Sequence, residues 1–108
     1  MDMIYGGAGQ GKLDYAKANY EQDRIIDHAE KIVLQCIRQG IEPVAFLQDS
    51  RNGFENKVLI FDDISMGVVP VGEEMRKWRD ANGSAMVWSA SAADSVIRVF
   101  CGIGLKMK

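Results

Sequence analysis

The sequence has few of the residues that would make it basic, membrane-spanning or cross-linked. Its 108 residues include two cysteines, two prolines and one histidine, and the 13 Lys and Arg residues are outnumbered by 15 Asp and Glu. Without a basic excess, the chain lacks the electrostatic footprint of a protein that binds nucleic acid. Its longest apolar runs, at residues 58–61 and 68–71, are too short to cross a bilayer. We therefore expect neither nucleic acid nor a membrane as a partner.

The cysteines and the N-terminus bear on the compartment. Cys36 and Cys101 lie far apart, in no metal-binding or disulfide spacing. Residues 1–5 have neither the basic nor the apolar region of a signal peptide. We expect a cytoplasmic protein with reduced thiols. Contents of 47 % hydrophobic and 26 % charged residues are typical of one globular domain, here residues 1–108.

The hydrophobic pattern predicts an α/β fold. Short β-favouring runs predict strands at residues 2–5, 57–61 and 95–101. Because long connections separate these strands, crossovers are required and we expect a short, mainly parallel sheet. Its exposed edges favour a homo-oligomer. Apolar residues at helical spacing predict helices from Lys12 onward and over residues 23–39, 42–49 and 73–93, with a loop at 64–72.

A glycine-rich segment between the first strand and the first helix carries the strongest functional signal. Its spacing, G-x-x-x-x-G-K, is that of a phosphate-binding loop. In such a loop the backbone N–H groups surround a phosphate, the helix N-terminus adds partial positive charge, and the lysine neutralises phosphate oxygens. The alternative is a turn that only connects strand to helix, and the G-x-G-x-x-G spacing of a dinucleotide site does not fit. The predicted nucleotide-binding residues are Gly6, Gly7, Ala8, Gly9, Gln10, Gly11, Lys12 and Leu13.

Two features of the sequence concern a metal ion at this loop. The position after Lys12, where a Ser or Thr hydroxyl usually holds Mg²⁺, is Leu13. Asp62 and Asp63 follow the central apolar run, and carboxylates at the C-terminal end of a parallel strand lie at the ligand-binding edge of the sheet. We predict that Asp62 or Asp63 holds Mg²⁺, weakly because Leu13 offers no ligand, and that Lys12 and Asp63 are catalytic. The alternative is a polar strand end without function.

Several motifs together resemble one family. Residues 6–12, GGAGQGK, resemble the GGA-x-x-GKS phosphate loop of the bifunctional adenosylcobinamide kinase / adenosylcobinamide-phosphate guanylyltransferase family. Residues 62–70, DDISMGVVP, are similar to its strand-end motif N-E-V-G-x-G-I/V-V-P. Further likenesses are WRDANG at residues 78–83 to F-R-D-x-x-G, AADSV at 92–96 to A-A-D-x-V, and CGIGLKMK at 101–108 to the closing G-I-G-x-K-I-K.

This resemblance implies a P-loop-type three-layer domain that assembles into an oligomer. It implies phosphoryl transfer from ATP or GTP to adenosylcobinamide in cobalamin biosynthesis, together with guanylyl transfer. In that chemistry Lys12 and the loop amides stabilise charge on the transferring phosphoryl group, while Asp62 or Asp63 holds Mg²⁺. The family's guanylyl-accepting histidine lies in an R-I-x-x-H segment. Residues 24–28, RIIDH, match that segment, which makes His28 the corresponding residue.

Departures from the family pattern favour a reduced or altered activity. The hydroxyl after Lys12 is missing, and Ser84, Met86 and Val87 stand where the family has Arg, Asn and Gln. His28 follows the phosphate loop too soon, without the strand that should precede it, and its helical phase predicts a solvated surface position. We therefore expect no covalent guanylylation. The alternative function is a catalytically silent paralogue that acts as a nucleotide-binding, regulatory or oligomeric subunit.

Overall fold

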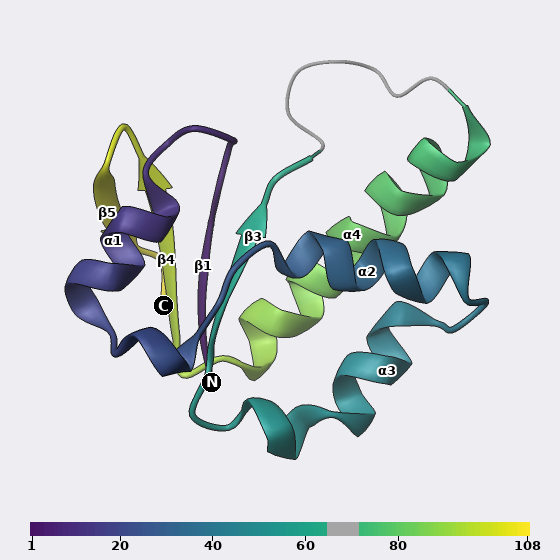
Figure 1. Ribbon diagram of the computed structural model, residues 1–108, viewed down its shortest axis with the longest axis horizontal. Coiled ribbons are helices and arrows are strands. Elements are labelled where there is room, and N and C mark those ends of the chain that lie inside the picture. Colours follow the sequence, from purple (N-terminus) through teal and green to yellow (C-terminus); the bar gives the residue numbers. More distant parts are fainter. Residues whose placement is uncertain (65–71) are drawn as a thin grey trace.

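The computed structural model describes residues 1–64 and 72–108, which form a sheet with helices on both sides. The strands are Asp2–Gly6 (β1), Ile25–Ile26 (β2), Val58–Asp62 (β3), Ser95–Phe100 (β4) and Ile103–Lys106 (β5). Within the described residues their order in the sheet is β2-β3-β1-β4-β5. The first four of these run parallel, and β5 pairs antiparallel with β4 (Figure 1).

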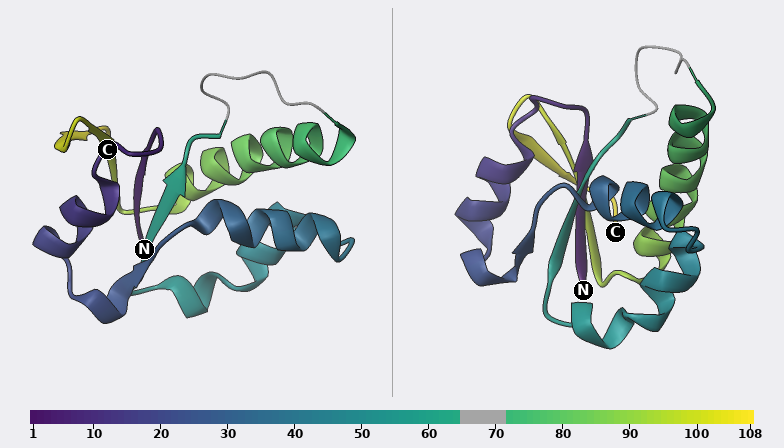
Figure 2. Two further views of the ribbon diagram at one scale, coloured as in Figure 1. Left: turned by 45° about the horizontal axis from the view of Figure 1, so that its top comes forward. Right: turned by 45° about the vertical axis from the view of Figure 1, so that its right-hand side comes forward.

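Four α-helices in the described part of the chain cover this sheet. They are α1 (Lys12–Asn19), α2 (Ala29–Arg38), α3 (Pro43–Asp49) and α4 (Glu73–Ala92), with short 3-10 turns at Gln22–Arg24 and Arg51–Phe54. Helix α1 lies on one face of the sheet, and α2, α3 and α4 lie on the other (Figure 2). The expected α/β class and mainly parallel sheet are confirmed, and the layering is compatible with a three-layer domain.

The central position of β3 explains the continuous apolar run at residues 58–61. Val58 and Ile60 pack in the core on the α1 side, whereas Leu59 and Phe61 pack against α2, α3 and α4. All four side chains are buried. Because helices cover both faces, every position of the strand can be apolar, and burial of each side chain contributes about 1.5–3 kcal/mol.

The expected helix over residues 23–39 is wrong in its first half. A 3-10 turn and β2 occupy residues 22–26, and α2 begins only at Ala29. Ile25 and Ile26 pair with Val58 and Leu59 of β3, so the two β-branched residues extend the sheet. Their burial comes from sheet packing and not from a helical stripe. The strand that was expected to be missing before His28 is therefore present.

The C-terminal end adds a further strand that the expected pattern of three strands does not include. Cys101 and Gly102 have φ of 51° and 76°, and two successive left-handed residues form the tight turn of a β-hairpin. This turn joins β4 to β5. Cys101 is exposed in the turn and does not belong to the strand, which ends at Phe100.

The other helices agree with the sequence prediction. Helix α4 continues through Asn82 and Gly83 without a break, and Asn82 is buried with its Nδ2 3.4 Å from the Asp62 carbonyl oxygen. The expected loop at 64–72 lies almost entirely outside the described residues. No helix in the described ranges has both the length and the apolar character needed to cross a membrane.

Candidate functional site

The glycine loop connects the end of β1 to the first turn of α1. Gly11 precedes α1 with φ of 91°, a left-handed conformation that favours glycine. Gly6 packs so closely on the backbone of Val99 in β4 that a Cβ would collide with its carbonyl oxygen. The β4–β5 turn also contacts the loop, because the Cys101 backbone N–H donates to Gln10 Oε1 at 2.8 Å. Glycine at position 11 therefore permits the left-handed backbone conformation, and glycine at position 6 permits close packing against β4.

Lys12, the first residue of α1, is held against the loop with its side chain 6 % exposed. Its Nζ donates to the Gly7 carbonyl oxygen at 2.7 Å and forms an ion pair with Asp62 Oδ1 at 2.6 Å. A lysine buried to this degree requires such partners, because an unpaired charge away from water is costly. The ammonium is thus fixed beside the loop, where a bound phosphate would lie.

Asp62 reaches the loop because β1 and β3 are neighbours in the sheet. Gly6 stands opposite Asp62 in the register, at the C-terminal edge of the parallel strands. Ligands of α/β sheets bind at this edge. The Asp63 backbone N–H donates to the Gly6 carbonyl oxygen at 2.9 Å. Among the described residues, however, Asp62 lines the hollow at the loop and Asp63 does not.

His28 borders the same hollow, which corrects the expected position on a helix surface. It precedes α2 with φ of 54°, a left-handed conformation, and β2 leads the chain to this point alongside β3. The side chain is 46 % exposed. Its Nδ1 lies 3.0 Å from Glu30 Oε1 and 3.8 Å from Asp62 Oδ2. Its Nε2 lies 3.5 Å from Asp27 Oδ2. The short distance along the chain therefore does not keep His28 away from the glycine loop.

Glu30 is a candidate that sequence reasoning missed. Its side chain is 3 % exposed, and its Oε2 is buried with no hydrogen-bond partner among the described residues. Burial raises the pKa of this carboxyl, and the hydrogen bond with His28 opposes the shift. A signal was available, because Glu30, Val33 and Ile37 share one face of α2 and that face packs on the core. Incompletely satisfied buried carboxylates are concentrated at functional sites.

The glycine loop, Lys12, His28 and Asp62 border one hollow of about 440 Å³, within the usual range of ligand sites. Leu13 presents apolar surface to it and so offers no metal ligand, whereas the next residue, Asp14, brings a carboxylate. The lining residues are Ala8, Gly9, Gly11, Lys12, Leu13, Asp14, Asp27, His28 and Asp62.

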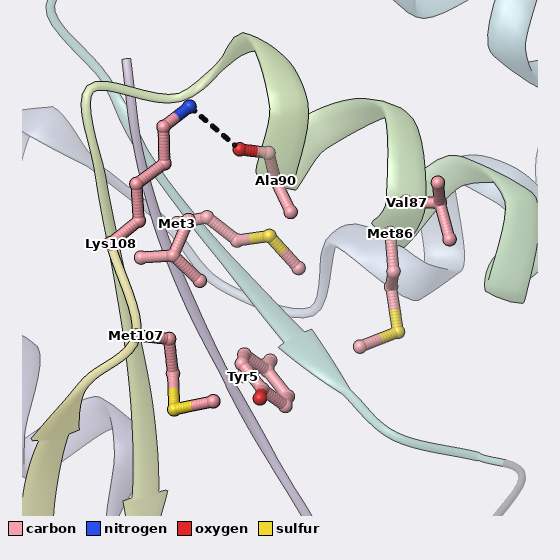
Figure 3. A pocket seen from close by; sticks show the side chains of 8 residues that line it. Met3, Tyr5, Met86, Val87, Ala90, Met107 and Lys108 are labelled. Carbon is pink, nitrogen blue, oxygen red and sulfur yellow. Dashed lines mark hydrogen bonds between the residues drawn. The ribbon is translucent and has the colours of Figure 1, made fainter.

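A second hollow, of about 290 Å³, is apolar and lies between α4 and the strands β1 and β4 (Figure 3). Lys108 is at its border, where the Nζ donates to the Ala90 carbonyl oxygen at 3.1 Å. Met86 and Val87 line this hollow, and Ser84 lines another along α4. The three departures from the family pattern in this segment therefore lie on a different surface from the glycine loop.

Comparison with known proteins assigns no family. No family model matches the sequence, and no curated protein matches it at a significant level. The function must therefore be inferred from the geometry of the site and from the motifs.

Proposed function

We propose that the chain binds the phosphates of ATP or GTP at its glycine loop and transfers a phosphoryl group to adenosylcobinamide, as the family that its motifs resemble does. The position of Lys12 carries this proposal. A turn that only connected β1 to α1 would leave the lysine in solvent, where lysines are normally found. Lys12 is instead buried against the loop, between the Gly7 carbonyl oxygen and Asp62.

The groups at the hollow suit phosphoryl transfer without a covalent intermediate. The loop N–H groups and the N-terminus of α1 would bind the phosphate oxygens, and Lys12 would stabilise the charge that develops on the transferring group. Asp62 lines the hollow and would hold the Mg²⁺ that accompanies a nucleotide, while Leu13 gives no second ligand. When bound, Mg²⁺ would neutralise phosphate charge. Guanylyl transfer through His28 is not proposed, because both ring nitrogens face carboxylate oxygens.

Titration calorimetry with ATP and GTP tests the phosphate site. Lys12→Ala should weaken nucleotide binding about 10- to 150-fold, the contribution of one charge-assisted hydrogen bond. Lys17→Ala is the matched control, because it removes the same charge from an exposed position of the same helix. Its effect should be less than about threefold. Equal affinity of the wild type and Lys12→Ala for both nucleotides would contradict the proposal.

A second candidate function is a catalytically silent nucleotide-binding subunit. The observation that favours it is the apolar character of α4 where the family is polar, since Val87 is 73 % exposed and Met86 lines an apolar hollow. A coupled assay of the ADP or GDP released from ATP or GTP, with and without adenosylcobinamide as acceptor, separates the two functions. Turnover that depends on the acceptor supports the kinase. Nucleotide binding without turnover supports the silent subunit.

We propose that copies of this chain associate through the β4–β5 hairpin. Phe100, Ile103, Leu105 and Met107 are exposed in and just after this hairpin, and Ile103 and Leu105 alternate along β5 and so share one face. In the described part of the chain β5 ends the sheet, and pairing of two such edges is self-complementary. Sedimentation velocity should show an oligomer that Leu105→Lys dissociates, and a monomeric wild type would contradict this.

A further inference from the structure

Three potential metal ligands, two from the start of α2 and one from the end of β3, meet beside the glycine loop. His28 precedes α2, Glu30 lies in the first turn of α2, and Asp62 ends β3. One ligand atom from each residue lies within 4.8 Å of the other two. One imidazole nitrogen and two carboxylate oxygens form a donor set that suits first-row transition ions, whereas Mg²⁺ prefers oxygen ligands alone.

The separations between these atoms fit a small cation. Two ligand atoms that each lie about 2.0–2.1 Å from a tetrahedral ion are about 3.3 Å apart. His28 Nδ1 lies 3.0 Å from Glu30 Oε1 and 3.8 Å from Asp62 Oδ2, values on either side of that spacing. The third pair, between Glu30 and Asp62, also lies within 4.8 Å, so side-chain rotations would place the three atoms around one ion.

Glu30 gives an independent indication that a positive partner belongs here. Its side chain is 3 % exposed, and its Oε2 makes no hydrogen bond within the described residues. The other oxygen of the same carboxylate contacts His28, so the unsatisfied atom lies next to the cluster. An unpartnered carboxylate oxygen away from water is unfavourable, and a cation bound to the same carboxylate would lower that cost.

The surroundings of His28 favour coordination through Nδ1. The opposite ring nitrogen, Nε2, faces Asp27 Oδ2 at 3.5 Å, and a carboxylate in this position commonly orients a metal-binding imidazole.

The net charge of the surrounding groups favours a divalent cation. When Asp27, Glu30 and Asp62 are all ionised, Lys12 offsets one of their charges, and a divalent ion balances the two that remain.

We propose that His28, Glu30 and Asp62 bind one divalent first-row transition ion, Zn²⁺ in the first instance, at the side of the nucleotide hollow. The ion would be held by the folded chain without nucleotide, in contrast to Mg²⁺, which would arrive with the phosphates. Asp62 can pair with Lys12 and bind the ion at the same time, because its Oδ1 contacts Lys12 while its Oδ2 faces His28. The site adds to the proposed nucleotide site but does not depend on it.

Untagged protein, freed of metal by chelation and transferred to chelator-free buffer, tests this site with two probes. Titration calorimetry with Zn²⁺ should show one ion bound per chain, with affinity at least about 100-fold greater than for Mg²⁺. Co²⁺ should give visible absorption stronger than that of the aqueous ion, without the near-ultraviolet thiolate band that Cys101 would produce. Cys101→Ser should bind Co²⁺ like the wild type.

Substitution of the ligands completes the test. His28→Gln and Glu30→Gln should each weaken Zn²⁺ binding about 100-fold or more, since loss of a ligand exceeds the loss of an orienting partner. Asp14→Asn, which changes a carboxylate of the same hollow outside the cluster, should change it less than about threefold. Zn²⁺ should also raise the thermal midpoint of the wild type but not that of Glu30→Gln. Circular dichroism checks that each variant is folded.

The outcomes separate this site from the nucleotide site. Absence of Zn²⁺ binding by the wild type, or unchanged binding by folded His28→Gln and Glu30→Gln, would overturn the metal site even if Lys12→Ala weakens nucleotide binding as expected. Conversely, Zn²⁺ bound by the wild type and lost in these variants supports the metal site even if no nucleotide binds, in which case only the proposed phosphate site fails.

Discussion

Replacement of Asp62 with asparagine should strengthen nucleotide binding without divalent cations and weaken it with Mg²⁺. In the free protein Asp62 Oδ1 lies 2.6 Å from the Lys12 ammonium, so phosphates would approach a lysine that is already paired and a carboxylate that repels them. Asp62→Asn removes the repulsion and keeps the shape of the side chain. With Mg²⁺ the same carboxylate attracts the cation of the nucleotide, so its loss acts in the opposite direction.

Coulomb's law gives the size of the gain. A phosphate oxygen on Lys12 would lie about 5–6 Å from the Asp62 carboxylate, because both would be within hydrogen-bond distance of one ammonium. At this distance two unit charges repel by about 1.5–3 kcal/mol for an effective dielectric constant of about 20–40, and salt lowers this to about 1–2 kcal/mol. We therefore expect Asp62→Asn to bind ATP or GTP about 5- to 30-fold more tightly than the wild type in EDTA.

Titration calorimetry in EDTA and in excess Mg²⁺ measures both effects. Asp63→Asn is the control, because it makes the same charge change at the next residue, which does not line the described hollow. It should alter affinity less than about threefold. Circular dichroism checks the fold, since the ion pair of Lys12 is lost. Unchanged or weaker binding by Asp62→Asn in EDTA would refute the competition between Asp62 and phosphate. If only Asp63→Asn weakens nucleotide binding in Mg²⁺, Asp63 and not Asp62 would be the carboxylate that binds Mg²⁺.

Three further predictions concern the loop and the histidine. Leu13→Ser should make nucleotide affinity depend more strongly on Mg²⁺, because the hydroxyl adds a ligand, and loss of all wild-type binding in EDTA would contradict this reading of Leu13. Gly6→Ala should lower the free energy of unfolding by about 1–3 kcal/mol, because its Cβ meets the Val99 carbonyl, whereas Gly7→Ala should cost less than about 0.5 kcal/mol. Urea denaturation compares the two, and equal losses would contradict the packing argument. Incubation with α-labelled GTP should leave no acid-labile label on the protein, and a label that His28→Ala removes would show the opposite.

The elements that follow from local sequence could be predicted. The apolar run of β3 and the glycine cluster before α1 indicate their structures without knowledge of their neighbours. Pro43 in the first turn of α3 marks that helix, and the Glu42 side chain accepts hydrogen bonds from the next turn, at 2.6 Å from the Ala45 N–H. Asp62 was also predictable as a site residue, because it ends a parallel strand at the ligand-binding edge.

The rest of the site depends on tertiary contacts. Strand β2 has two residues, and Ile25 and Ile26 fit a helical stripe as well as they fit a strand until β3 lies beside them. A helix over residues 23–39 places His28 on a helix face. In the structure His28 has a left-handed conformation and separates β2 from α2. The burial of Glu30 follows from the packing of α2 on β3. Neither residue could be joined to Asp62 without the order of the strands in the sheet.

The residues that depart from the motifs of the resembled family lie at two different surfaces. Their separation allows the kinase and the silent subunit to be distinguished. Leu13 lies at the hollow beside the glycine loop, where it offers no metal ligand and leaves Lys12 and the loop amides in place. Met86 and Val87 line the apolar hollow beside α4 (Figure 3), which shares no lining residue with the hollow at the glycine loop. If Met86 and Val87 abolish transfer, nucleotide binding should persist, because the groups proposed to bind phosphate are elsewhere. Binding without transfer would therefore support the silent subunit, whereas loss of both would indicate that the glycine loop is only a turn.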